Sequence, residues 1–298
     1  MKLKKYITSI VMMTLSLALT VGCSSSENND IQTSEVKQGE EVVVATSVAV
    51  TEILDKLGVK VSGVPTTSYE LPESVKNATE VGSPMNPDME IIKSLNPTVV
   101  VSVDTLGVDY IELFTQNNIP SEFVSLESLE GLKEAVTTLG ERFNKTEEAT
   151  SLLSEIENKE KEVSDKAKGL EGKEILILFA APGSTMIATS KSYIGSLVKI
   201  VGGKNIVEDN STSFTTYNKE DLAMLNPEKI LVMVHAMPEE TKAALEKEMS
   251  TDSAWQNIKA VKEGNVVYLD STYFGMSANL KVIEGLDILS DIVHGDGE

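Results

Sequence analysis

Residues 230–240 read ILVMVHAMPEE and place His235 where an apolar run with the character of a buried strand ends. The chain has two histidines, and the other, His294, lies close to the C-terminal end. An imidazole at the end of a strand can bind a metal, transfer a proton or serve a structural role. A lone histidine in this place is more often structural, so His235 alone does not decide among these roles.

Few other side chains suggest a catalytic or metal-binding site. Cys23 is the only cysteine, which excludes an intramolecular disulfide. We recognise no nucleophile–base pair and no phosphate-binding loop, and GGKN at 202–205 is typical of a turn that ends a helix. A site for free Zn²⁺ or Mn²⁺ needs several histidine or carboxylate ligands, which a chain with two histidines does not readily supply. We therefore expect a protein that is not an enzyme.

The composition bounds the remaining classes. A length of 298 residues with 41% hydrophobic residues allows two domains with real cores. The net charge of −20 disfavours binding to nucleic acid, which depends on neutralising phosphates. Such acidity is typical of a soluble surface.

The N-terminus reads MKLKKYITSIVMMTLSLALTVGC, in which lysines precede an apolar run. This pattern is typical of a secretory signal peptide and is too short for a stable membrane-spanning helix. Its end, TVGC at 20–23, resembles the lipobox of bacterial lipoproteins, in which the signal is removed before a cysteine that becomes lipidated. We therefore expect a signal peptide over 1–22, a lipid on Cys23 and a polar, flexible tether over 23–40.

From Val42 onward, short apolar runs alternate with segments of helical spacing, which predicts α/β sheets covered on both faces. The expected strands are 42–46, 98–103, 122–126, 174–180, 230–235 and 266–270. The expected helices include 107–118, 129–144, 192–201 and 277–293.

A repeat divides this pattern into two halves. Residues 89–103 read MEIIKSLNPTVVVSV and residues 219–235 read KEDLAMLNPEKILVMVH. Each segment has a glutamate, then Leu-Asn-Pro, then an apolar strand. The asparagine precedes proline and so disfavours the α conformation, which ends the helix. The repeat predicts two lobes of similar, Rossmann-like build.

Residues 145–169 contain no proline and carry a thin apolar stripe that includes Leu152 and Ile156. We interpret them as one long amphipathic helix that joins the lobes, although an ordinary surface helix of one domain is also possible. The expected organisation is an N-terminal lobe over 41–144, a backbone helix over 145–169 and a C-terminal lobe over 170–298.

This arrangement resembles the class of periplasmic binding proteins with a rigid helical backbone. These are the substrate-binding lipoproteins of ABC importers for siderophores, cobalamin and haem. Several stretches further resemble the haem-binding lipoproteins of the iron-regulated surface determinant system. They are VGSPMNPDME at 81–90, APGSTMIATSKSYIGSLVKIVGGKNIV at 181–207, VHAMPEE at 234–240 and YFGMSANL at 273–280.

The resemblance implies that haem b lies in a cleft between the lobes, with Met85 and His235 as its axial ligands. A thioether and an imidazole would leave the iron no open position, which suits a carrier. His235 would lie at the carboxyl end of a strand, where open α/β sheets bind ligands. Pro84 and Pro87 would hold Met85 in a non-helical loop before a helix that begins near Asp88. Without the resemblance, Met85 would more often be core filler, because the chain has 11 methionines.

Other residues of the cleft are expected to contact the haem around its iron. Haem propionates could lie near a helix N-terminus, and we expect one helix over 51–57. Met237 could be a rival ligand or a neighbour of His235, and His294 is expected to be a solvated tail residue. The expected haem contacts are Ser47, Val48, Ser68, Tyr69, Tyr273, Phe274 and Met276. The alternative is that these residues only pack the lobes together.

Glu90 and Glu220 begin the repeated helices. The resemblance implies that they dock onto arginines of an ABC permease, whereas the simpler interpretation is that acidic residues favour a first helical turn. The expected partners are the permease with its ATPase and an upstream haem donor. We expect a monomer held by its lipid on the outer face of the cytoplasmic membrane, in a Gram-positive cell.

The alternative cargo is a ferric siderophore or a corrinoid. Pockets for anionic siderophores usually gather arginine, tyrosine or tryptophan side chains. This chain has Arg142 as its single arginine and Trp255, within a helical segment, as its single tryptophan. These counts favour haem.

Overall fold

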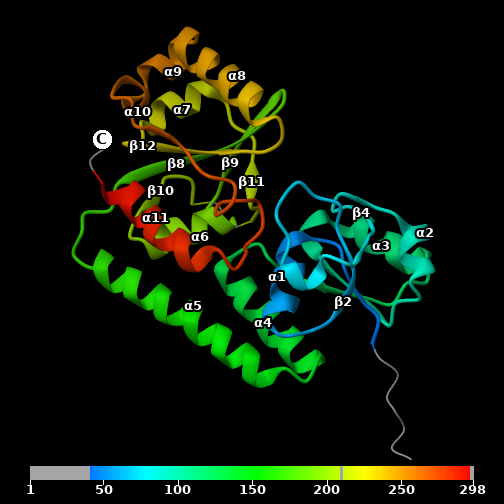
Figure 1. The fold of residues 1–298 in the computed structure, drawn as a ribbon. Coiled ribbons are helices and arrows are strands. Elements are labelled where there is room, and N and C mark those ends of the chain that lie inside the picture. Colours follow the sequence, from blue (N-terminus) through cyan, green and yellow to red (C-terminus); the bar gives the residue numbers. More distant parts are fainter. Residues whose placement is uncertain (1–40, 209–210, 296–298) are drawn as a thin grey trace, which may run out of the picture. The chain divides into compact units, whose positions relative to one another are not determined.

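A computed structural model describes residues 41–208 and 211–295 (Figure 1). The predicted signal peptide, Cys23 and the tether lie outside these residues. None of the helices in the described ranges has the length and apolar character that crossing a membrane requires.

Five parallel strands form the sheet of the N-terminal lobe, in the order β3-β2-β1-β6-β7. All five residues of β6 are buried, as expected for a sheet covered on both faces. The strands are β1 Val43–Ala45, β2 Val61–Val64, β3 Thr79–Glu80, β6 Val99–Val103 and β7 Ser121–Val124. The short strands β2 and β3 were not predicted from the sequence.

Helices cover both faces of this sheet. Alternate residues of a strand point to opposite faces, so Val43 packs with α1 and α4 while Val44 packs with α2 and α3. The helices are α1 Val48–Lys56, α2 Met89–Ser94, α3 Val108–Gln116 and α4 Leu129–Arg142. The helices predicted over 107–118 and 129–144 are therefore confirmed, with ends one or two residues shorter.

The C-terminal lobe has a mixed sheet, in the order β11-β9-β8-β12-β13. The predicted apolar strands β8, β12 and β13 are parallel, whereas β9 and β11 run antiparallel to their neighbours. β9 was missed because its sequence, STMIA, begins with two polar residues and has only a short apolar run. The strands are β8 Glu174–Ala181, β9 Ser184–Ala188, β10 Lys204–Asn205, which pairs with β8, β11 Phe214–Thr215, β12 Lys229–Val234 and β13 Val266–Tyr268.

Figure 1 shows α7, α8, α9 and α10 on one side of this sheet and α6 and α11 on the other. The helices are α6 Tyr193–Ile200, α7 Lys219–Leu225, α8 Pro238–Thr251, α9 Ser253–Asn257, α10 Lys259–Lys262 and α11 Val282–His294. The last helix begins at Val282 and not at 277 as predicted. Asn279 accepts a hydrogen bond from the Lys281 amide and forms a turn ahead of the helix.

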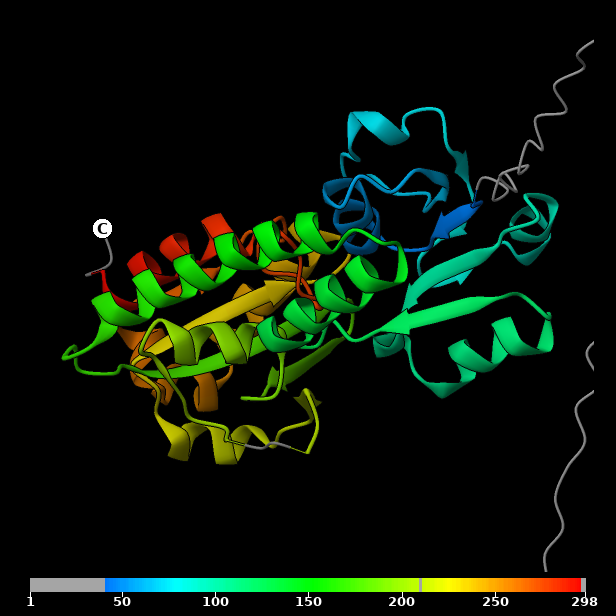
Figure 2. The ribbon, with the colours of Figure 1, turned by 90° about the horizontal axis from the view of Figure 1, so that it is seen from below.

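The predicted backbone helix is present as α5, Thr146–Ala167. It packs against α4 of the N-terminal lobe and against α6 and α11 of the C-terminal lobe (Figure 2). One apolar cluster runs from β1 through α4 and α5 to α11, so the two lobes share a continuous core. The interpretation of α5 as a connector is therefore supported by its contacts.

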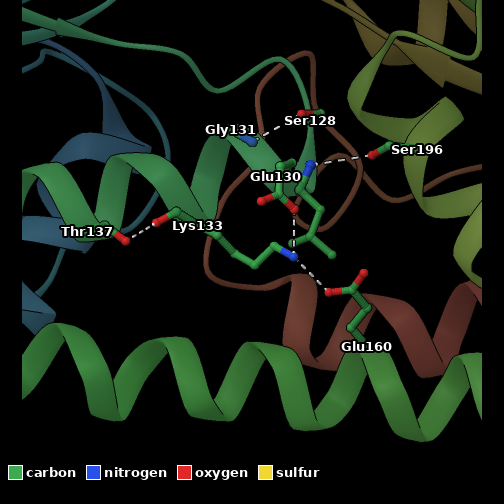
Figure 3. A network of polar contacts seen from close by, with 8 residues as sticks. Ser128, Glu130, Gly131, Lys133, Thr137, Glu160 and Ser196 are labelled. Atoms are coloured by element: carbon green, nitrogen blue, oxygen red, sulfur yellow. Dashed lines mark hydrogen bonds and ion pairs between the residues drawn. The ribbon is translucent and has the colours of Figure 1, made fainter.

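Polar contacts fix α5 in place (Figure 3). Lys133 of α4 lies 2.7 Å from Glu130 and 3.1 Å from Glu160 of α5, measured from Nζ to the carboxylate oxygen. On the other side, Lys159 of α5 lies 2.8 Å from Asp287 of α11. Burial by itself lowers the pKa of Lys133. Its contacts with the two glutamates raise the pKa by more than burial lowers it, so the net shift is upward.

The repeated helices α2 and α7 each end before an asparagine in the left-handed conformation, Asn96 with φ 50° and Asn226 with φ 42°. The predicted stop is confirmed, but its reason is more specific than the proline alone. Proline excludes the α region for the preceding residue, and asparagine accepts the left-handed alternative better than most residues. The same geometry in both lobes supports the predicted repeat.

Candidate functional site

Met85 lies at the tip of a small hairpin. Strands β4 (Gly82–Ser83) and β5 (Asn86–Pro87) pair antiparallel, and Pro84 and Met85 form the two-residue turn between them. The methionine side chain is 70% exposed. The sequence predicted only a non-helical loop here, and the hairpin explains how a flexible thioether is presented on a defined backbone.

The base of this hairpin is tightly held. The Thr66 amide donates to the Gly82 carbonyl at 2.8 Å, and the Asp88 amide donates to the Val81 carbonyl at 2.7 Å. The Asp88 carboxylate accepts from the amides of Glu90 and Ile91 and caps α2, which confirms the predicted start of that helix. The backbone that carries Met85 is thus continuous with the helix that carries Glu90.

His235 follows directly after β12, at the carboxyl end of that strand. Its amide donates to the Ala180 carbonyl at 2.8 Å, which extends the ladder between β12 and β8 by one bond. His235 is exposed, and its ring stacks on Phe179 with centroids 5.5 Å apart and an angle of 30° between the planes. Phe179 was not singled out from the sequence, although it is the one aromatic residue in the otherwise aliphatic run EILILFAA.

Two residues after His235 adopt the left-handed conformation, Ala236 with φ 62° and Met237 with φ 43°. Non-glycine residues adopt this conformation at a cost, and such positions concentrate at functional sites. The turn leads directly into α8, where Pro238 occupies the first position.

Met237, 56% exposed, lines a cavity of about 540 Å³ that lies entirely within the C-terminal lobe. The lining includes Ala180 of β8, Tyr217 and Leu245 of α8. Neighbouring strand residues point to opposite faces, so this cavity lies on the Ala180 face while His235 packs on the Phe179 face. The Met237 side chain and the His235 ring therefore lie on opposite faces of the sheet.

The residues expected near haem propionates lie on two segments. Ser47 caps α1 by accepting from the Val50 amide at 3.2 Å, and the helix begins at Val48, so the helix predicted over 51–57 starts three residues too late. Ser68 and Tyr69 are exposed in the loop after β2. The Tyr69 hydroxyl lies 3.4 Å from the Ser271 hydroxyl, which brings this loop to the segment after β13 in the other lobe.

The apolar contacts expected from 273–276 divide into two groups. Phe274 is 2% exposed and belongs to the core, because its ring packs with α11 residues such as Val282 and Leu286. The expectation that Phe274 offers its ring to a ligand is therefore corrected for this structure. Tyr273 is half-buried, with its hydroxyl 3.3 Å from Glu284, and Met276 is 43% exposed.

Further polar and backbone contacts join the lobes near these segments. Lys191 lies 3.5 Å from Glu127, and the Ala278 amide donates to the Leu126 carbonyl at 2.8 Å. The sequence offers no periodic signal for such pairs, because each joins segments far apart in the chain. They place the loop after β7 against the C-terminal lobe.

Glu90 and Glu220 are each the second residue of their helix, α2 and α7, as the repeat predicted. Glu90 is exposed and lies 3.8 Å from Lys93 on the same helix. At the C-terminal end of α7, Met224 is 78% exposed.

His294 differs from its prediction. It is the last residue of α11 and half-buried, and its Nε2 lies 2.5 Å from the Val201 carbonyl at the end of α6. The expectation of a solvated tail was wrong, because the apolar face of α11 continues to Val293. At the same place Gly202, with φ 80°, ends α6, which confirms the turn predicted for GGKN.

In the described ranges, no cluster of three or more histidine, cysteine, aspartate or glutamate side chains is arranged to hold a metal ion. The loops that carry the candidate site residues lie instead at the carboxyl ends of strands in two α/β lobes. Two such lobes joined by a long helix define the class of two-lobed solute-binding proteins.

Comparison with known proteins agrees with this class. The family model described as periplasmic binding protein matches residues 43–273, and the chain belongs to that family. It is 36% identical to the high-affinity heme uptake system protein IsdE of Staphylococcus aureus strain Newman, over 297 residues that cover 99% of each chain.

Solved structures give the same picture. S. aureus IsdE complexed with heme matches with a TM-score of 0.82 and 37% identity, over 86% of this chain and 100% of that one. An ABC transporter substrate-binding protein from Listeria monocytogenes EGD-e matches with a TM-score of 0.83 and 35% identity, with the same coverage. The apo periplasmic heme-binding protein RhuT from Roseiflexus, 20% identical with a TM-score of 0.71 over 86% of this chain and 98% of that one, shows the shared fold alone.

Proposed function

We propose that this protein binds haem b between its two lobes and delivers it to an ABC permease for uptake of haem iron. The observation that carries the proposal is the full-length similarity to a heme uptake protein, at 36% identity over 99% of both chains. The similarity extends to a fold that has been solved with heme bound.

In this proposal Met85 and His235 are the axial ligands of the iron. Each is supplied by a loop of a different lobe, and each is presented on a held backbone, the hairpin β4–β5 for Met85 and the end of β12 for His235. A thioether and an imidazole form a six-coordinate iron without an open position for oxygen, which suits transport and not catalysis. We therefore propose a carrier with no enzymatic activity.

The propionates of the bound haem would lie near the start of α1, at Ser47 and Val48, and near Ser68 and Tyr69. The support is that Ser47 caps α1, whose first amides attract negative charge, and that Tyr69 reaches across to Ser271. Tyr273 would provide apolar contact with the porphyrin, with Phe274 buried behind it. Replacing Tyr69 with phenylalanine should weaken haem binding; an unchanged dissociation constant would remove Tyr69 from this role.

Glu90 and Glu220 would dock onto basic residues of the permease. Their equal positions in α2 and α7 support this, because two contacts at a fixed separation set an orientation even when each is individually weak. The double variant Glu90→Gln/Glu220→Gln should load haem normally and lose uptake in cells. Glu147→Gln, an exposed first-turn glutamate of α5, is the matched control. Uptake that survives in the double variant would contradict the docking role.

We further propose that Cys23 carries the lipid that holds a monomer on the outer face of the cytoplasmic membrane of a Gram-positive cell. The signal peptide would span 1–22, the tether 23–40, the N-terminal lobe 41–144, the connecting helix 145–169 and the C-terminal lobe 170–298. An upstream surface protein would donate haem, and the permease and its ATPase would receive it. Metabolic labelling with a palmitate analogue tests the anchor, because Cys23→Ala should abolish the label.

Titration of the lipid-free protein with haemin tests the central proposal. A saturable low-spin absorption spectrum is expected, and Met85→Ala and His235→Ala should each change it. Met224→Ala, at another exposed methionine, and His294→Ala are matched controls that should leave the spectrum unchanged. Absence of saturable binding, together with retention of a ferric siderophore or a corrinoid from cells, would favour the alternative cargo.

A further inference from the structure

Three aromatic rings form a continuous row that ends at His235. Phe214 of β11 packs on Phe179 of β8 with centroids 5.0 Å apart, and Phe179 stacks on the His235 imidazole at 5.5 Å. The angle between the Phe179 and His235 planes is 30°, so the two rings lie nearly face to face. The row runs along one sheet from β11, past β9, to β8 and the residue that follows β12.

The His235 ring nitrogens have no hydrogen-bond partner among residues 41–208 and 211–295. A metal-binding histidine normally donates its second ring N–H to a carboxylate, a carbonyl or water, and no carboxylate or carbonyl of the described residues takes that place here. Such a bond normally fixes both the tautomer and the plane of the ring. The side-chain contact observed at His235 is the stacked ring of Phe179, which can act on the plane of the imidazole.

The backbone fixes where the ring begins but not how it is turned. The His235 amide bonds to Ala180, and the left-handed Ala236 and Met237 turn the chain away immediately afterwards. These backbone contacts do not restrict rotation of the imidazole about its side-chain bonds. The stacked face of Phe179 is the side-chain contact that restricts this rotation.

We propose that Phe179 is a positioning residue that sets the plane of the His235 imidazole by stacking on its face. The inference rests on the proposed role of His235 as an iron ligand.

The haem-free protein provides the first test, by NMR of the histidine ring protons. The chain has two histidines, so the signals of His235 and His294 are easily assigned. Ring current from Phe179 should displace the His235 signals. Phe179→Leu should remove the displacement and Phe179→Tyr should keep it, with His294 unchanged in both. His235 signals that are the same in Phe179→Leu and the wild type would overturn the stacking.

The haem-loaded protein provides the second test, by electron paramagnetic resonance of low-spin ferric haem, whose g values depend on the ligand plane. Phe179→Leu should change or broaden the g values and speed haem transfer to apomyoglobin by about tenfold, the lower end for loss of a residue that orients a metal ligand. Phe179→Tyr should retain both properties. Phe123→Leu is the matched control, because Phe123 is half-buried and packs on Phe114 at 5.5 Å in the other lobe.

The outcomes separate two failures. Faster haem loss in Phe179→Leu with unchanged g values would mean that Phe179 merely contacts the porphyrin, and positioning would be refuted. A wild-type protein whose iron signal does not depend on His235 would refute the proposed ligand itself, whatever the haem-free NMR result.

Discussion

Gly82 lies so close to Asp88 that a Cβ atom at Gly82 would come within 2.7 Å of the Asp88 backbone nitrogen. Gly82 also has φ 91°, a conformation that other residues rarely adopt. These two constraints shape the base of the hairpin that presents Met85. The absence of a side chain at Gly82 is therefore a condition for the position of the proposed ligand.

Gly82→Ala should destabilise the protein and disturb the hairpin. Gly107 is the matched control, because it has the same φ of 91° but no atom within 4 Å of an added Cβ. Gly107→Ala should cost about 1–3 kcal/mol from backbone strain alone. Gly82→Ala should cost about 1–3 kcal/mol more, because of the clash. Urea unfolding measures both costs, and equal costs would show that the close approach to Asp88 is unimportant.

The two asparagines of the repeat should differ on substitution by glycine. Both have left-handed backbones. The Asn96 side-chain nitrogen donates an exposed, local hydrogen bond to the Ser94 carbonyl at 3.2 Å, whereas the side-chain oxygen of Asn226 accepts a hydrogen bond from the distant Lys259 amide at 2.8 Å. Asn96→Gly should be nearly neutral, and Asn226→Gly should cost about 0.5–1.5 kcal/mol for the lost bond. Thermal unfolding of the two variants measures the difference, and a larger loss at Asn96 would contradict it.

Lys133→Met should weaken the attachment of α5 to α4. The Lys133 side chain is 16% exposed and contacts two glutamates, so the loss should be about 1–2 kcal/mol. Lys161→Met is the control, because Lys161 is 74% exposed and pairs with Asp165 on the same helix, and it should cost about 0.5 kcal/mol or less. Chemical unfolding at neutral pH gives both values.

The pKa of Lys133 adds a dependence on pH. Because the pKa is raised in the folded state, the contribution is complete below the unfolded pKa of about 10.4 and is lost as the pH rises through the folded pKa. The stability difference between wild type and Lys133→Met should therefore be constant across neutral to mildly alkaline pH. It should shrink as the pH rises through the pKa of Lys133 in the folded state. A difference that disappears near pH 8 would contradict this assignment.

Haem binding should change the overall dimensions little. The lobes share one apolar cluster, and α5 is fixed to α4 by Lys133 and to α11 by Lys159. A wide hinge motion would have to break these contacts. Small-angle X-ray scattering of the haem-free and haem-loaded protein should give nearly equal radii of gyration, and a large decrease on loading would show that the helical backbone is not rigid.

The fold was largely predictable because its main signals are local and repeated. The buried strands β6 and β12 are continuous apolar runs, and the Leu-Asn-Pro repeat marks the end of α2 and α7. β9 was missed because its polar residues hide the strand. His294 was misassigned because its contact with Val201 is set by the packing of α11 on α6, which no local pattern records.

The site was less predictable because its contacts join segments that no local sequence pattern connects. The types and positions of Met85 and His235 are visible in the sequence, but the contacts around them are not. The stacking of Phe179 on His235 depends on the register between β8 and β12. The burial of Phe274 likewise depends on how the segment before α11 folds onto the core.

The claim that Met85 and His235 bind one iron is tested most directly by NMR of methyl-labelled methionines in the protein loaded with ferrous haem. The porphyrin ring current moves the methyl group of an axial methionine far upfield. One such signal is predicted in the wild type; it should disappear in Met85→Leu and in His235→Ala and persist in Met237→Leu and Met276→Leu. An upfield methyl signal that survives Met85→Leu, or that is lost only in Met237→Leu, would contradict the account.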